Sequence, residues 1–386
     1  MKSETLHIGF LPLVDAAGLI AACDLGFAEA EGLKIELVRE ASWSNIRDRL
    51  ALGHLDAAHM LTPMVVASQL KLNQLHAPLA ALVNLALNGN AITVSPALHA
   101  RIEAQVEGDF ADPAATAAAL ERVVRKREAQ GEEPLTFGMT FPFSTHNYLL
   151  RHWMAAGDVD PDRDLRLVVL PPPLMAESLA KGLVDGFCVG APWNSVAVAA
   201  GLGVILHYGC EIFSRAPEKV LAMRESAISD DRDRASALIR ALVGGARHAE
   251  DPANRREIAA LLARPDRVGV DAELISRTLE GRLRIDVEGA TRRRDDYLIL
   301  ARDGACRPEP IRGAWLYAQA LRWGQARFEP DDLAAAKSVM RADLFDGAAG
   351  GASPTGASAP GAFSGEFFDE GEIQAYVNGF AIGTKI

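Results

Sequence analysis

Cysteine is scarce in this sequence, and long apolar runs are missing. Only four of the 386 residues are cysteines, and no two form a C-x-x-C pair, so a scaffold held together by disulfides is excluded. No stretch approaches the ~18 consecutive apolar residues of a membrane-spanning helix. The N-terminal residues also lack an apolar segment that ends at a small-residue cleavage site. These absences predict free thiols in a reducing compartment, and therefore a cytoplasmic protein without a membrane partner.

Positive charge is also in short supply. The chain has 40 Lys and Arg against 51 Asp and Glu, which gives a formal net charge of -11. Such a surface repels phosphate backbones, so direct binding to nucleic acid is not expected. An anion held by this chain would need local donors that act against an unfavourable overall field.

The common catalytic and cofactor motifs are absent. There is no phosphate-binding G-x-x-x-x-G-K-[ST], no G-x-G-x-x-G between a strand and a helix, no G-x-S-x-G and no H-E-x-x-H. His54 and His59 are five residues apart, and His146 and His152 six. Neither spacing places two imidazoles on one helical face, as a zinc site on a helix requires. We therefore expect no enzyme activity, no cofactor and no metal site.

The pattern of apolar residues predicts strands that alternate with helices. Such alternation indicates βαβ units, a mainly parallel sheet and an α/β fold. It occurs in two blocks, one before about residue 95 and one from about 135 to 210, and the remainder to about 325 is mostly helical. The expected strands are 6–11, 34–38, 56–61, 79–87, 91–94, 135–140, 165–170, 186–189 and 204–208.

Residues 347–365 differ in composition from the rest of the chain. Nearly all of them are Gly, Ala, Ser or Pro, which cannot bury enough apolar surface to become ordered, so a flexible linker is predicted. Aromatic residues return in 366–386, which indicates a C-terminal tail that packs back on the body.

Polar and aromatic residues cluster where predicted strands end and helices begin, the usual position of a small ligand in an open α/β sheet. Each has a structural alternative: Trp43 as a core ring, His146 as a helix cap, Lys219 as a solvated surface charge, and Asn88-Gly89-Asn90 as an ordinary turn. The candidates are Trp43, Thr62, Gly89, Asn90, Thr145, His146, Pro192, Trp193 and Lys219.

Together these pieces resemble the nitrate/bicarbonate-binding proteins of ABC importers. The order and approximate spacing of the similar segments hold over nearly the whole chain, which makes the resemblance more specific than any one segment. The segments include Ile8 to Leu13 with Asp15, Ala41-Ser42-Trp43, His59 to Met64, Asn88-Gly89, Thr145-His146, Val169 to Pro173, Cys188 to Gly190 with Pro192-Trp193-Asn194, Pro217-Glu218-Lys219, Trp315, Arg322-Trp323-Gly324, Arg341 to Phe345 and Tyr376 to Ile382.

The resemblance implies a type II periplasmic-binding-protein-like fold, with two α/β lobes, a ligand cleft between them and a helical C-terminal part. On that template, residues 1–94 form the first part of lobe 1 and residues 95–219 form lobe 2. Residues 220–346 return to lobe 1 and add C-terminal helices, followed by the linker 347–365 and the tail 366–386.

The resemblance also implies which residues hold the anion. Trp43, Gly89, His146 and Lys219 match the family's ligand residues, and the family's glutamine falls on Asn90, which is one methylene shorter. Thr62, Thr145, Pro192 and Trp193 are secondary candidates. Bicarbonate binders of the family carry an acidic residue where Lys219 stands, so this lysine favours nitrate or nitrite. As a cleft-facing cation, Lys219 is expected to contribute little to the stability of the fold.

Combined with the absent export signal, the chain resembles the cytosolic nitrate/nitrite sensors (NasS-type) of nitrate-assimilation operons. Such a sensor sequesters an ANTAR-type RNA-binding antiterminator in the absence of ligand and releases it when the anion binds. The alternatives are a nitrate-binding subunit of an ABC importer and an enzyme on the same fold. The enzyme would need a cysteine- or histidine-centred active site, which the motifs do not indicate.

Overall fold

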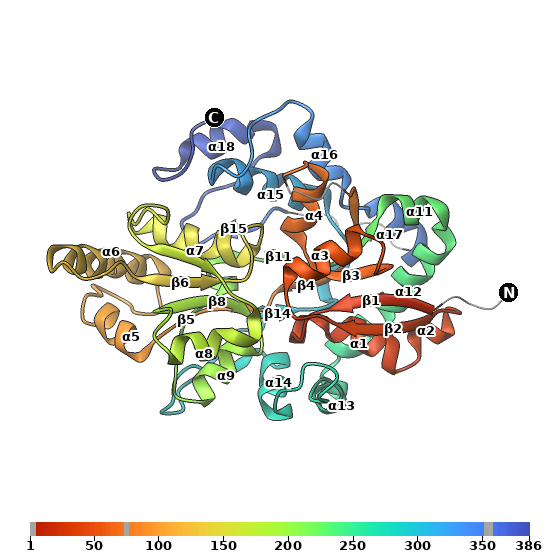
Figure 1. Ribbon diagram of the computed structural model, residues 1–386, viewed down its shortest axis with the longest axis horizontal. Helices are drawn as coiled ribbons and strands as arrows, with labels where there is room; N and C mark the ends of the chain where they lie inside the picture. Colours follow the sequence, from red (N-terminus) through yellow and green to blue (C-terminus); the bar gives the residue numbers. More distant parts are fainter. Residues whose placement is uncertain (1–4, 73–76, 351–357) are drawn as a thin grey trace.

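The structure, a computed structural model, describes residues 5–72, 77–350 and 358–386. Two β-sheets, each covered by helices, form two lobes that lie side by side (Figure 1). Lobe 1 contains the six-stranded sheet and lobe 2 the five-stranded sheet. The expected α/β fold with two lobes is confirmed. Among the described residues, no helix is both long enough and apolar enough to cross a membrane.

Both sheets are mixed rather than mainly parallel. In lobe 1 the order is β14 (Leu298–Ile299), β4 (Leu79–Asn88), β11 (Pro217–Arg224), β3 (Ala57–Leu61), β1 (Thr5–Phe10) and β2 (Lys34–Arg39). In lobe 2 the order is β7 (Arg166–Val169), β6 (Thr136–Met139), β8 (Gly186–Gly190), β5 (Asn90–Val94) and β9 (Val204–Tyr208). The antiparallel strands include β4, β5 and β11. The chain passes between the lobes through these strands. A strand that comes from the other lobe runs antiparallel to its neighbours in the sheet that it joins.

The crossings lie a few residues from the expected boundaries. The chain leaves lobe 1 at Gly89, whose φ is +94°, and β5 at Asn90–Val94 already pairs with β8 and β9 of lobe 2. On the way back, β11 begins at Pro217 and pairs with β3 and β4 of lobe 1. The expected boundary after residue 94 therefore falls at the end of β5, and the one after residue 219 falls inside β11. Glycine at position 89 permits the left-handed backbone that this abrupt change of sheet requires.

Local capping chemistry explains where several helices begin. The Ser42 hydroxyl accepts a hydrogen bond from the Asn45 amide at 3.3 Å, which caps the first turn of α3. At α7 the cap is Ser144, whose hydroxyl accepts from the Asn147 amide at 3.1 Å. Thr145 is the first residue inside that helix, and His146, whose structural alternative was a helix cap, is the second.

The helices and short elements complete the two lobes. Those of lobe 1 and the C-terminal part are η1 (Val14–Ala16), α1 (Ala17–Asp24), α2 (Phe27–Ala30), α3 (Trp43–Ala51), α4 (Thr62–Gln69), α11 (Glu225–Asp230), α12 (Arg232–Glu250), η3 (Pro252–Asn254), α13 (Arg255–Leu262), α14 (Ala272–Leu279), η4 (Arg302–Gly304), α15 (Pro310–Arg322), α16 (Asp332–Ser338), α17 (Ala342–Ala349), η5 (Glu370–Glu372) and α18 (Ile373–Gly379). Those inserted between them are α5 (Pro96–Glu103), α6 (Pro113–Ala129), α7 (Thr145–Ala156), η2 (Pro172–Leu174), α8 (Met175–Ala180), α9 (Trp193–Ala199) and α10 (Gly209–Ile212). A small hairpin joins β12 (Arg282–Arg284) to β13 (Thr291–Arg293).

The expected flexible linker is partly ordered. Residues 347–349 belong to α17, and Gly361–Ala362 forms β15, which pairs antiparallel with β10 (Phe213–Ser214). The prediction for residues 351–357 lies outside the described residues. Composition alone pointed to flexibility, because the stabilising partner of β15 lies about 150 positions earlier in the chain and gives no local signal. Farther along the tail, α18 packs against α15.

One hydrophobic cluster spans both lobes. It contains Trp43 and Leu61 from lobe 1 together with Phe137 and Trp153 from lobe 2, all fully or almost fully buried. A second cluster covers the opposite face of the lobe 1 sheet, where Ile8 of β1 packs with α1 and α12, and it also includes Ala91 and Tyr208 of lobe 2. Side chains alternate between the two faces of a strand, so β3 contributes Ala57 to one cluster and Ala58 to the other.

Candidate functional site

Five ionisable side chains lie buried where the two lobes meet. Asp15, His59, His146, Glu218 and Lys219 are each at most 1 % exposed. We refer to these five residues as the buried ionic cluster. Asp15 comes from η1, His59 from β3, His146 from α7, and the other two from β11. Charged groups are seldom buried unless they are paired, so a concentration of this kind marks a functional site.

Lys219 is at the centre of the cluster. Its Nζ donates to Glu218 Oε1 at 2.7 Å and lies 2.9 Å from Asp15 Oδ2. Neighbouring side chains in a regular strand point to opposite faces, but β11 shifts register against β4 on both sides of Lys219. This irregularity brings two consecutive side chains together. Burial lowers the pKa of Lys219, but the two carboxylates raise it more, so the pKa lies above its ordinary value and the ammonium stays charged.

Asp15 also pairs with His59, whose Nε2 lies 2.9 Å from Asp15 Oδ1. Burial raises the pKa of Asp15, but Lys219 and His59 outweigh it, and the pKa falls far below its ordinary value. Burial is also the largest influence on His59 and lowers its pKa, in spite of the neighbouring carboxylate. Asp15 is therefore a permanent negative charge, and His59 is a neutral partner that orients it.

Glu218 accepts hydrogen bonds from several sides. Asn90 Nδ2 donates to Oε2 at 2.7 Å, Lys219 donates to Oε1, and His146 Nδ1 lies 3.2 Å from Oε1. Burial raises the pKa of Glu218 to about 7, although Lys219 pulls it down. Burial lowers the pKa of His146 well below its ordinary value, with Lys219 acting in the same direction, so this imidazole is neutral.

Several polar atoms of the site have no hydrogen-bond partner among the described residues. Those that also form no ion pair include Trp43 Nε1, His146 Nε2 and Asn90 Oδ1, all buried. Lys219 Nζ lies 5.3 Å from the centre of the Trp43 ring. Gly190 borders the same space, because a Cβ added there would lie 3.4 Å from Asp15 Oδ2 and 3.7 Å from His146 Nε2. Two unused ring nitrogens beside an ammonium suit a small acceptor-rich anion.

The structure brings four of the five principal candidates together: Trp43, Asn90, His146 and Lys219. Gly89, the fifth, forms the crossing next to Asn90, and its carbonyl accepts from the Ala191 amide at 2.9 Å. The sequence suggested that Lys219 would be a free cation facing the cleft, and this expectation is wrong. It is completely buried and already paired with two carboxylates.

The secondary candidates take structural positions around the site. Thr145 Oγ1 donates to the Pro217 carbonyl at 2.7 Å, next to Glu218. Trp193 Nε1 donates to the Pro12 carbonyl at 3.1 Å and so links lobe 2 to lobe 1. Pro192 follows Ala191 through a cis peptide bond. Thr62 Oγ1 is buried at the start of α4 without a partner among the described residues.

Sequence reasoning gave no site role to Asp15, His59 and Glu218. All three lie in segments that carry the family resemblance, but nothing marked them as partners of Lys219. One usable signal was present. His59 lies within the otherwise apolar strand Ala57–Leu61, and an ionisable group in such a strand needs a buried partner. Among the described residues, no group of three or more His, Cys, Asp or Glu side chains is arranged to hold a metal ion.

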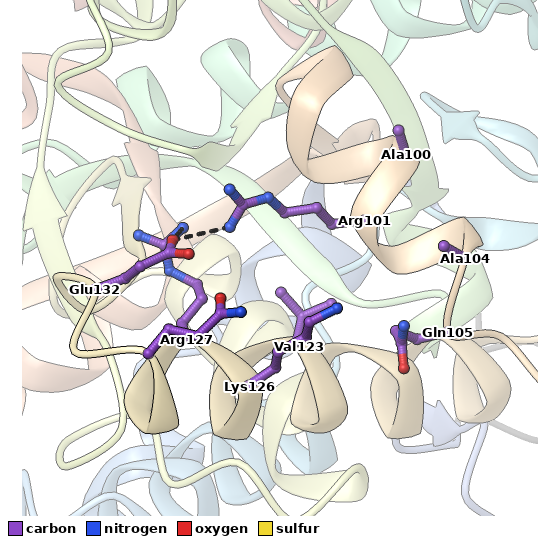
Figure 2. A pocket seen from close by; sticks show the side chains of 9 residues that line it. Ala100, Arg101, Ala104, Gln105, Val123, Lys126, Arg127 and Glu132 are labelled. Carbon is purple, nitrogen blue, oxygen red and sulfur yellow. Dashed lines mark hydrogen bonds and ion pairs between the residues drawn. The ribbon is translucent and has the colours of Figure 1, made fainter.

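A separate surface pocket of about 390 Å³ lies between α5 and α6 (Figure 2). Arg101 and Arg127 both pair with Glu132 there, at 3.0 and 2.7 Å. The pocket shares no residue with the buried ionic cluster. The charged side chains of this pocket are partly exposed to solvent, whereas those of the cluster between the lobes are buried, so the cluster remains the stronger candidate site.

Comparison with known proteins gives a consistent result. Residues 1–263 match the NMT1-like family. The nitrate import ATP-binding protein NrtC of Synechocystis sp. is 34% identical over 357 residues, and the alignment covers 89% of this chain and 50% of that protein. The nitrate/nitrite binding protein NrtA of Synechococcus elongatus is 31% identical, with 90% and 78% covered. The crystal structure of the periplasmic nitrate-binding protein NrtA from Synechocystis PCC 6803 superimposes with a TM-score of 0.89 at 27% identity and covers 99% of both chains.

Bicarbonate transport proteins are also among the relatives, at a similar level of identity. The chain spans about half the length of the transport ATP-binding proteins that it matches.

Proposed function

Because this chain belongs to the NMT1-like family and to the nitrate/bicarbonate-binding branch of importer proteins, we propose that it binds nitrate or nitrite between its lobes. The observation that carries the proposal is the buried ionic cluster, where the Lys219 ammonium lies 5.3 Å from the centre of the Trp43 ring, and Trp43 Nε1 and His146 Nε2 have no partner among the described residues. Nitrate is planar, singly charged and accepts hydrogen bonds without offering a proton, so it fits a cation flanked by N–H donors. The relatives are binding and transport proteins, which agrees with the expectation that this chain is not an enzyme.

Lysine at position 219 favours nitrate over bicarbonate. Bicarbonate has a proton to donate and would be served by an extra acceptor, whereas nitrate needs donors and positive charge. Calorimetric titration of the purified protein with nitrate, nitrite and bicarbonate tests the proposal. Binding of nitrate or nitrite at micromolar to millimolar concentration, with weaker binding of bicarbonate, is the expected result. Tighter binding of bicarbonate, or no binding of any of the three, would contradict the proposal.

Gly190 provides a first mutational test of the location. We expect Gly190→Ala to fold normally, because residue 190 has no positive φ and the new methyl would make ordinary contacts of 3.4 Å or more. The methyl would nevertheless occupy the space beside His146 Nε2. Crowding of this kind costs about 1–3 kcal/mol, so the dissociation constant for nitrate should rise about 5- to 150-fold. Thermal unfolding and titration, with Gly347→Ala on a remote helix as control, measure both effects. Unchanged affinity would place the anion elsewhere.

For the biological use of this binding, we propose the sensor role: without anion the protein sequesters an ANTAR-type antiterminator in the cytoplasm, and it releases this partner when nitrate or nitrite binds. A ligand that prefers one lobe arrangement shifts the population of that arrangement and so changes the surface that a partner contacts. The alternative, a binding subunit of an ABC importer, draws equal support from the relatives, which are named as transport proteins. That alternative includes a membrane partner, contrary to the expectation from the sequence.

Gel filtration and cell fractionation separate the two uses. For a sensor we expect a stable complex between the apo protein and the antiterminator, which millimolar nitrate dissociates. A 100-fold shift needs a difference of only about 2.7 kcal/mol between the two states, which is an ordinary coupling energy. An elution profile that nitrate leaves unchanged, or recovery of the protein from the periplasm, would favour the importer subunit.

A further inference from the structure

Glu218 carries a further inference, which rests on the proposed function. Its carboxylate is planar and negatively charged, and its two oxygens accept from Lys219 and Asn90 at 2.7 Å each. His146 Nδ1 is 3.2 Å away. Lys219, Asn90 and His146 are also the residues expected to hold the anion. The donors of the site are therefore already occupied by an anion that belongs to the protein.

We propose that Glu218 is an internal competitor of nitrate, and that nitrate binds with the uptake of one proton at this carboxyl group. With Glu218 ionised, Asp15 and Glu218 outnumber the single positive charge of Lys219, and nitrate would add a third negative charge to a fully buried site. Protonation of Glu218 removes one negative charge and frees the lysine ammonium to face the anion. Charges buried in a low-dielectric site interact strongly, so the two events are coupled.

The hydrogen-bond pattern around His146 points the same way. A neutral imidazole that donates from Nε2 to an anion must accept at Nδ1. The two groups that face Nδ1 are the Thr140 hydroxyl at 3.1 Å and Glu218 Oε1 at 3.2 Å. An ionised Glu218 can only accept, which holds the proton on Nδ1 and leaves Nε2 as an acceptor. A protonated Glu218 can donate to Nδ1, and the free Nε2–H then points to the unfilled space beside Gly190.

The other ionisable groups of the site have pKa values that are shifted away from that of Glu218. The groups that face Glu218 are Lys219 on its own strand, His146 and Thr145 on α7, Asn90 on β5, Asp15 on η1 and Cys188 on β8. Asp15 stays ionised and His59 and His146 stay neutral, as described above. Burial raises the pKa of the Cys188 thiol well above its ordinary value, so it stays protonated. Burial raises the pKa of Glu218 to about 7, whereas the pKa values of Asp15, His59 and His146 are lowered and that of Lys219 is raised.

The test is the pH dependence of nitrate affinity, since nitrate itself stays fully ionised. The dissociation constant of the wild type should be nearly constant below about pH 7 and rise above it, approaching tenfold per pH unit for one coupled proton. Titration calorimetry at about pH 8, in two buffers with different ionisation enthalpies, should show the uptake of about one proton for each nitrate bound.

Glu218→Gln removes the charge and keeps the shape of the side chain. This variant should bind nitrate with the same affinity from about pH 6 to 9, take up no proton, and exceed the wild-type affinity about tenfold or more near pH 8. Glu177→Gln is the matched control, because Glu177 is an exposed residue of α8 that pairs with Lys181. It makes the same change in net charge and should behave as the wild type does.

The outcomes separate this inference from the proposed function. Wild-type protein that binds nitrate with no pH dependence and no proton uptake overturns the role of Glu218 and leaves nitrate binding in place. Wild-type protein that binds no nitrate at any pH overturns the proposed function itself. If Glu218→Gln does not fold, the wild-type proton count still decides the question.

Discussion

Lys219→Ala should weaken nitrate binding about 10- to 150-fold, because loss of a charged hydrogen-bond partner costs about 1.5–3 kcal/mol. The same substitution should lower the free energy of unfolding by about 3–5 kcal/mol, since removal of one member of a buried ion pair leaves uncompensated charge. Here two carboxylates, Asp15 and Glu218, lose their shared cation. The sequence alone indicated that the fold would tolerate this change, and the complete burial of Lys219 corrects that expectation.

The two effects can be separated by a second substitution. In the Lys219→Ala background, Glu218→Gln should restore part of the lost stability, because it removes one of the two unpaired carboxylates. It should not restore nitrate affinity, because the cation is still missing. Chemical denaturation and nitrate titration of the two single variants and the double variant form the measurement, with Lys181→Ala as an exposed control. Independent, additive effects on stability would show that the two side chains do not interact as the structure indicates.

Gly245→Ala should destabilise the protein by about 2 kcal/mol or more, although alanine favours a helix by about 0.8–1 kcal/mol over glycine. Gly245 lies inside α12, and a Cβ there would lie 2.3 Å from the Gly18 carbonyl oxygen and 2.6 Å from the Ala22 amide nitrogen. These are backbone atoms of α1, so the helix itself would have to move. Since α1 follows directly after η1, which carries Asp15, its displacement should also weaken nitrate binding.

Two neighbouring cases provide the controls. At Gly244 a new Cβ would meet the Phe27 ring at 2.8 Å, and a side chain can rotate away, so Gly244→Ala should be much less harmful. A Cβ added at Gly347 in α17 would meet no atom within 4 Å outside the nearby backbone of its own helix. Gly347→Ala should therefore stabilise the protein by up to about 1 kcal/mol. Thermal or chemical denaturation ranks the three variants. Equal effects of Gly244→Ala and Gly245→Ala would contradict the close approach of α1 and α12.

Sequence reasoning located features that local chemistry determines. The strand β3 and the turn at Gly89 both follow from residue types at short spacing. The family resemblance added the two lobes and two residues of the buried ionic cluster, His146 and Lys219, together with Trp43 and Asn90 beside it. Features that depend on distant or irregular geometry were not predictable. The register shift that turns Glu218 toward Lys219 leaves no trace in the sequence, and β15 depends on a partner strand far away in the chain.

The hydrophobic cluster that joins the lobes has a consequence for folding. Trp43 and Leu61 share a core with Phe137 and Trp153, and the chain of lobe 1 is completed only after lobe 2 has been inserted. Part of the hydrophobic core of each lobe is therefore supplied by the other lobe. The protein should unfold as a single cooperative unit, and a lobe taken from a relative would need its half of the shared core to match. The interface that encloses the proposed anion site is thus also part of what holds the whole chain folded.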